Sequence, residues 1–170
     1  MRPLEKLGNI FDRVVDILAY LAGVIIIFMM ISIVYEIFMR YFLASPTKWV
    51  VDVTALSILF MTFLGTAWVL RRGQHVKVDI VTERLSSRAQ ALLNIIVFSL
   101  AAIACLVLTW YSGFTTWDNF KEGTLVLRTI TYPKAPVLAI IPIGSFLLFI
   151  QFLRNTRGPL RTWRALGDKD

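Results

Sequence analysis

The side chains best placed to do chemistry are carboxylates and arginines near the ends of two apolar runs. Glu36 and Arg40 lie four residues apart at the end of the first run, and Trp49 and Asp52 open the second. A carboxylate is favoured near a helix N-terminus, and a guanidinium binds carboxylates through charge-assisted hydrogen bonds. We therefore predict an Arg40–Asp52 ion pair with Trp49 packed nearby. The alternative is that these residues are ordinary anchors at the membrane interface.

Other reactive side chains are few. His75 is the only histidine, Asp79 follows it by four residues, and the single cysteine, Cys105, lies in an apolar run. Haem held by two histidines is excluded, and no spacing suits a metal, a nucleophile with its base, or a phosphate loop. We expect no catalytic, cofactor-binding or metal site, and we assign His75 and Asp79 a structural role. The chain is thus predicted not to be an enzyme.

Four long uncharged runs dominate the rest of the sequence, at 17–35, 53–70, 89–117 and 135–153. Each is long enough to cross a hydrocarbon core of roughly 30 Å as a helix. The predicted fold is an all-α integral membrane protein with one domain, 1–170. Its approximate spans are 14–40, 47–70, 88–117 and 134–155.

Several residues mark expected helix boundaries. Ser45 and Pro46 resemble an N-cap and first-turn proline for the second helix. Pro142 removes one backbone donor and is expected to kink the fourth span, whose stop we place at Gly158 and Pro159.

The basic residues predict an orientation. The N-terminal lead, the second connection and the tail hold 13 of the 18 Lys and Arg residues, which places both termini in the cytoplasm. We expect Asp16 to pair with Arg13 or to reach the interface. The net charge of +7 then reflects membrane topology and not nucleic-acid binding. The basic residues expected to face anionic lipid are Arg71, Arg72, Arg154 and Arg157.

No charged residue occupies the middle of any run. A proton-coupled exporter is expected to carry one there, so the pattern favours a static protein. Small residues such as Ala19 and Gly23 allow helices to approach closely, either within the chain or in a partner.

At this point a resemblance becomes visible in the order and spacing of motif residues. The first half carries Arg40, Tyr41, Phe42, Trp49, Asp52, Gly65, Arg71, Arg72, Gly73, His75, Val78 and Asp79. The fourth span carries Tyr132, Pro133, Pro136, Pro142, Ile143 and Gly144. This pattern resembles the small membrane (Q) subunit of tripartite ATP-independent periplasmic (TRAP) transporters over most of the chain. Asp52 departs from the more frequent Glu, and Lys134 from a common aromatic residue.

The resemblance implies a non-catalytic small permease subunit in the bacterial inner membrane. By that resemblance it pairs with a large multi-spanning permease subunit that holds substrate and sodium, while a soluble periplasmic protein delivers the substrate. The implied role is a scaffold in the transport of small organic acids such as dicarboxylates or sialic acid. The alternatives are a self-assembling four-helix channel or small exporter, and a membrane anchor for a redox enzyme.

Overall fold

The computed structural model describes residues 3–45, 47–72 and 87–167. Its helices are α1 (Pro3–Phe42), α2 (Lys48–Arg71), α4 (Ser87–Lys121), α5 (Lys134–Leu138) and α6 (Ile140–Gly167). Two antiparallel strands, β1 (Leu125–Val126) and β2 (Tyr132–Pro133), form a short hairpin between α4 and α5. Within the described ranges, four helical stretches are long and apolar enough to cross a membrane. The predicted helical class and its four spans are confirmed, and the hairpin is the one addition to them.

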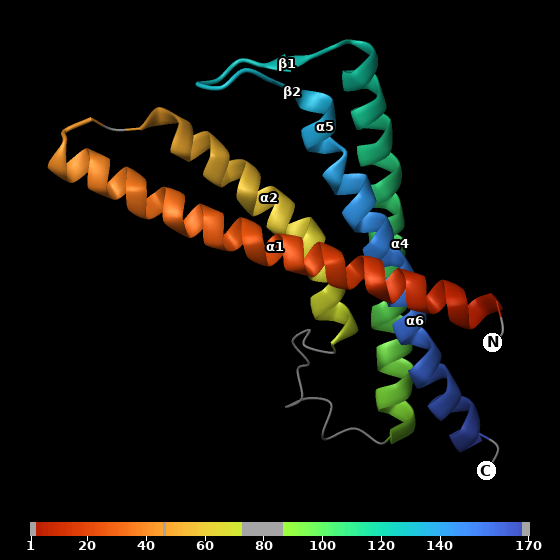
Figure 1. The fold of residues 1–170 in the computed structure, drawn as a ribbon. Helices are drawn as coiled ribbons and strands as arrows, with labels where there is room; N and C mark the ends of the chain where they lie inside the picture. The colour runs from red at the N-terminus through yellow and green to blue at the C-terminus, as the bar shows by residue number, and fades with distance from the viewer. Residues whose placement is uncertain (1–2, 46, 73–86, 168–170) are drawn as a thin grey trace.

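Helix α1 is much longer than a bilayer requires. Its 40 residues extend about 60 Å at the rise of an α-helix, whereas the hydrocarbon core is roughly 30 Å thick. A straight helix of this length has to tilt steeply or run partly along the membrane surface. Figure 1 shows α1 crossing α4 and α6 obliquely, with α2 beside it.

The helix ends follow from local backbone geometry. Ser45 does not cap α2, because its amide donates to the Met39 carbonyl at 3.3 Å and so belongs to the end of α1. Thr47 is the N-cap residue instead, so α2 begins two residues later than predicted. Helix α4 ends at Lys121. Gly123 follows with a φ of +62°, which suits glycine, and the amides of Gly123 and Thr124 bond back to the last turn.

The two prolines of the fourth span behave differently. Pro142 has no amide to give the Leu138 carbonyl, and the helix breaks there, with α5 ending at Leu138 and α6 beginning at Ile140. The interruption at Ala139 falls in the turn before Pro142, where we predicted a kink. The predicted stop at Pro159 is wrong, because α6 continues through it to Gly167. Pro159 lies at the end of the apolar span, which closes at Leu160, where water can satisfy a freed carbonyl.

The helices pack as an open row and not as a closed bundle. α1 packs on α2, α2 on α6, and α6 on α4, and Figure 1 shows the α1–α2 hairpin diverging from the α4–α6 hairpin. Small residues let the helices approach: a Cβ on Gly65 would lie 3.8 Å from Ala22, and one on Gly144 would lie only 2.7 Å from the Cβ of Phe63. At Gly144, α6 therefore lies so close to Phe63 of α2 that an added Cβ would not fit without a shift.

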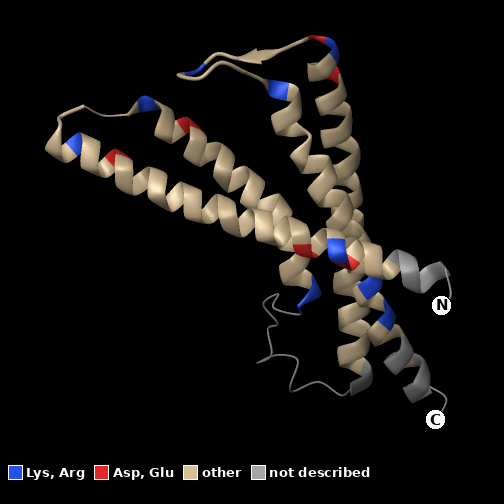
Figure 2. Cartoon of the chain, viewed as in Figure 1, with Lys and Arg blue, Asp and Glu red and all other residues tan. Residues whose placement is uncertain are grey.

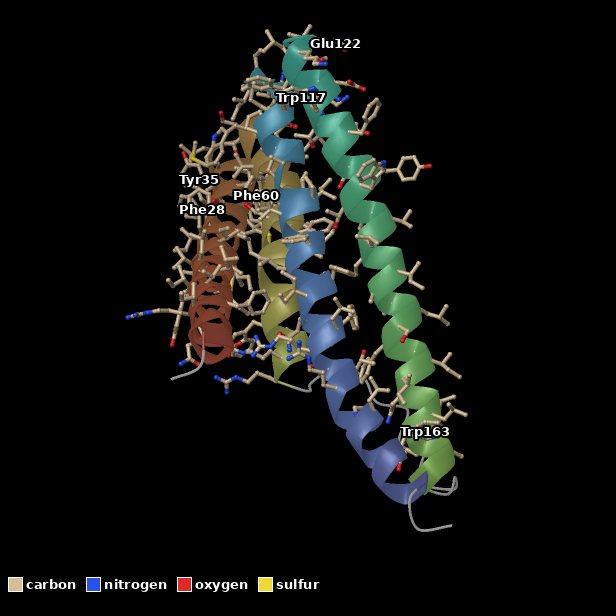
Figure 3. The ribbon with its side chains drawn as sticks, turned by 90° about the vertical axis from the view of Figure 1, so that its right-hand side faces the viewer. Phe28, Tyr35, Phe60, Trp117, Glu122 and Trp163 are labelled. Carbon is tan, nitrogen blue, oxygen red and sulfur yellow. The ribbon has the colours of Figure 1, made fainter. Side chains whose placement is uncertain are left out.

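Most large apolar side chains lie on the surface. The buried apolar residues are mainly small, whereas α1 exposes a nearly continuous apolar face. Figure 3 shows Phe28 and Tyr35 on α1, Trp117 near one end of α4, and Trp163 at the opposite end of the molecule. Such surfaces are stable in lipid or against another membrane protein, and tryptophans at both ends are typical of membrane interfaces.

Candidate functional site

A cluster of four ionised side chains joins three helices where α1 passes the end of α2. We call it the ion cluster: Asp12, Asp16, Arg71 and Arg154. Arg154 of α6 binds Asp12 with two hydrogen bonds, Nη1 to Oδ1 at 2.7 Å and Nη2 to Oδ2 at 3.1 Å. Arg71 of α2 donates to the Asp12 backbone carbonyl at 2.8 Å and to the Asp16 carboxylate. A single carboxylate, Asp12, therefore contacts arginines from two other helices.

The sequence places these groups by simple helix geometry. Asp12 and Asp16 are four residues apart, so they lie on the same face of α1. Arg71 is the last residue of α2, where a cation is favoured by the helix dipole. Arg154 follows the apolar part of α6, and its guanidinium also lies 5.2 Å from the centre of the Phe11 ring. The charges of the cluster balance, and its side chains are only 21–41% exposed.

A second polar contact reinforces the same junction. Asn155 donates to the Leu70 carbonyl at 3.3 Å and accepts from Gln151 at 3.0 Å. Leu70 lies in the last turn of α2, where carbonyls lack helical partners, so Asn155 satisfies one of them. The end of α2 is thus bonded to α6 through neutral as well as charged groups.

These contacts correct several predictions. Arg71 and Arg154 were expected to face lipid, but their guanidinium groups bind carboxylates of α1. Asp16 pairs with Arg71 and not with Arg13, because α2 ends beside the face of α1 that carries Asp16. Sequence reasoning missed Asp12 altogether. The available signal was two acids at helical spacing together with arginines at the same predicted depth on two other spans.

At the other end of α2 the predicted ion pair is wrong. Asp52 is buried, and its Oδ1 lies 3.5 Å from Nη1 of Arg128, while its Oδ2 accepts from the Thr129 amide at 3.2 Å. Arg40 lies 3.8 Å from Glu36 on its own helix. The reason is that the connection around β1 and β2 reaches back to the start of α2 and supplies the partner of Asp52.

The remaining site candidates have varied positions. Trp49 packs across the α1–α2 hairpin on Tyr35, with ring centres 6.3 Å apart. Arg72 is exposed, and its guanidinium lies 4.6 Å from the centre of the Trp68 ring. Arg157 and Pro136 are exposed as well. His75 and Asp79 lie outside the described residues.

The charged residues gather in a few places. Figure 2 shows them near the connections and at the ion cluster, with stretches free of charged residues between. Arginine–carboxylate pairs of this kind hold helices together, and within the described ranges no group of His, Cys, Asp and Glu could hold a metal ion. The contacts of the ion cluster thus join α1, α2 and α6.

The fold and the ion cluster define a multi-pass membrane protein whose polar groups fasten its own helices. The sequence model of a transporter family, tripartite ATP-independent periplasmic transporters, DctQ component, matches residues 29–162. The chain belongs to this family and is a small permease subunit of TRAP transporters in the inner membrane.

Three relatives show how far the similarity extends. The small permease protein TeaB of an ectoine TRAP transporter from Halomonas elongata is 21% identical over 147 residues, covering 86% of this chain and 76% of TeaB. A TRAP transporter small permease protein of Haemophilus influenzae is 22% identical, covering 85% of this chain and 89% of its own. The sialic acid TRAP transporter permease protein SiaT of Haemophilus influenzae is 22% identical over 135 residues, which make up 79% of this chain but only 21% of SiaT.

Proposed function

We propose that this subunit is a static scaffold for a large multi-spanning permease subunit in a sodium-coupled transporter that receives small organic acids from a periplasmic binding protein. The observation that carries the proposal is the ion cluster. It fastens α1, α2 and α6 at one place, with Asp12 bound by Arg154 at 2.7 and 3.1 Å. A transport domain that moves needs a fixed frame beside it, and helices fastened in this way supply one.

The apolar character of the spans supports the same division of labour. In the described part of the chain, charged side chains lie in the ion cluster, near the connections and toward the chain ends, and the stretches between them carry no charged residue (Figure 2). Substrate and sodium sites need convergent polar groups within the membrane. We therefore assign those sites to the large subunit.

The match to SiaT supports association with a larger permease. The segment like this chain makes up 21% of SiaT, so a related sequence exists within one longer permease chain. The substrate class rests on the family resemblance alone. TeaB is named for ectoine and SiaT for sialic acid, and the two are nearly equally identical to this chain. Sequence identity to these relatives therefore does not select a substrate.

A self-assembling channel or small exporter is not favoured. The family match and the relatives, which are permease subunits of TRAP transporters, point to a subunit of a larger transporter instead. We also propose that both termini are cytoplasmic, because most basic residues lie on that side. The ion cluster then lies near the cytoplasmic surface and the β1–β2 hairpin near the periplasm.

Affinity purification from the native host in mild detergent tests the proposal. We expect a large permease in stoichiometric amount, and solute uptake in vesicles only when both subunits are present. The variant Arg154→Gln should lower the yield of that complex, whereas Arg157→Gln, an exposed arginine one turn further along α6, should not. Solute movement by this chain alone would overturn the scaffold role.

A further inference from the structure

A groove between α1 and α2 opens beside the ion cluster. Its volume is about 850 Å³, within the range of small-molecule sites. The walls are formed by small and apolar side chains, with Ala19 and Gly23 on α1 and Gly65 on α2. A Cβ added at Gly23 would meet nothing within 4 Å, so the groove is open there.

The groove runs from an apolar end to a charged mouth. Met61 lines its far end and Arg72 its mouth, a separation of about 16 Å along α2 at the rise of an α-helix. That length matches half of the hydrocarbon core, about 15 Å for one leaflet. A lipid acyl chain of the leaflet at this mouth thus has the length to fill the groove.

The mouth carries one positive charge in excess. Arg71 and Asp16 line it and bind each other, so their charges compensate. Arg72 adds a further cation, exposed and held over the Trp68 ring at 4.6 Å. Tryptophan and arginine side by side at the end of a span are suited to the headgroup region, and basic pockets between membrane helices favour anionic headgroups.

We propose that the α1–α2 groove binds one anionic phospholipid, with an acyl chain between Gly23 and Gly65 and the phosphate at Arg72. The lipid fills a gap that the two helices leave unpacked and extends the apolar surface of the hairpin. We assign the phosphate to Arg72 because the guanidinium groups of Arg71 and Arg154 already bind carboxylates.

Native mass spectrometry of the full chain in mild detergent tests the site, with phosphatidylglycerol or phosphatidylcholine added at equal concentration. We expect one retained phosphatidylglycerol molecule. Arg72→Gln should lower its retention about five-fold, the factor for losing one cation at a membrane surface, and leave phosphatidylcholine unchanged. Arg157→Gln is the charge-matched control and should change neither. Equal retention of the two lipids by the unmodified chain would overturn the proposal.

A second pair of variants tests the groove itself. Gly23→Leu adds a side chain into the open groove and should abolish lipid retention. Gly8→Leu, also open at its Cβ but outside the groove, should not. If Gly23→Leu fails to fold, the proposal is tested by the ratio of retained phosphatidylglycerol to retained phosphatidylcholine in the Arg72→Gln variant.

The competing occupant is a helix of another protein. A photo-crosslinking residue at position 26, which lines the groove, should yield a lipid-sized adduct in native cells. A protein-sized product in its place would overturn the lipid assignment. It would leave the scaffold proposal standing, because co-purification tests that separately.

Discussion

The two ends of α2 are held in different ways. At the cluster end, near Arg71, charged and amide side chains from α1, α2 and α6 bond to one another, with distances between 2.7 and 3.3 Å among Asp12, Arg154, Asn155 and their partners. At the hairpin end, Asp52 contacts a connection, through the Thr129 amide and an arginine, Arg128, whose side chain is 61% exposed.

This difference explains the shape of the molecule. Helices bonded to each other through partly buried charges keep a fixed relation, because removing one partner strands the other charge. The pair at the other end joins buried Asp52 to Arg128, whose side chain is 61% exposed and belongs to a connection, so it holds no second helix in place. Accordingly the α1–α2 pair and the α4–α6 pair lie together near the ion cluster. They diverge toward the β1–β2 hairpin (Figure 1). The helices are therefore bonded to one another at the cluster end, whereas at the other end α2 is bonded only to a connection.

The largest effect is expected from Asp12→Asn. This change removes the charge that two arginines share, and we expect the free energy of unfolding in mixed micelles to fall by about 2 kcal/mol, an estimate that allows for partial exposure. Glu36→Gln removes a carboxylate from the same helix and should cost far less. An equal fall in the free energy of unfolding for the two variants would show that the ion cluster contributes no more than the Glu36–Arg40 contact.

A somewhat smaller effect is expected where α2 crosses α6 between its ends. A Cβ at position 144 would lie 2.9 Å from the Phe63 carbonyl oxygen, so Gly144→Ala should destabilise the protein by about 1 to 2 kcal/mol through overpacking. Gly158→Ala, on the same helix with nothing within 4 Å of the added Cβ, is the control for helix propensity. If both variants unfold alike, the α2–α6 contact is less tight than described.

At the hairpin end, Asp52→Ala should cost about 1 kcal/mol, because one amide and one exposed guanidinium lose their acceptor. Arg128→Gln should cost less, since Asp52 still accepts from the Thr129 amide. Hydrogen exchange checks this locally: the Thr129 amide should exchange faster in Asp52→Ala and nearly normally in Arg128→Gln. Unchanged exchange in both would show that Asp52 does not hold the connection.

The smallest effect is expected from Arg40→Gln. Its contact with Glu36 lies within one helix, the two groups are 3.8 Å apart and the Arg40 side chain is 53% exposed, so the pair contributes about 0.3 kcal/mol. The same unfolding measurement applies. A loss as large as that of Asp52→Ala would revive the Arg40–Asp52 pairing that the structure contradicts.

The sequence predicted what depends on local pattern. Apolar length revealed the four spans, and the missing amide of Pro142 predicted the break before α6. It could not predict partners that depend on how each helix is rotated about its axis. Asp12 and Arg154 are 142 residues apart and Asp52 and Arg128 are 76 residues apart, so neither pair leaves a local signal. Pro159 misled because a proline at the edge of the membrane need not end a helix.

The long separation of Asp12 and Arg154 also has a consequence for biosynthesis. Asp12 leaves the ribosome before Arg154, so the doubly bonded pair forms only after α1, α2 and α4 have been made. Until then Asp12 has Arg71 as its only partner within the ion cluster. A chain truncated before α6 keeps the two carboxylates of Asp12 and Asp16 with a single arginine of the ion cluster, Arg71.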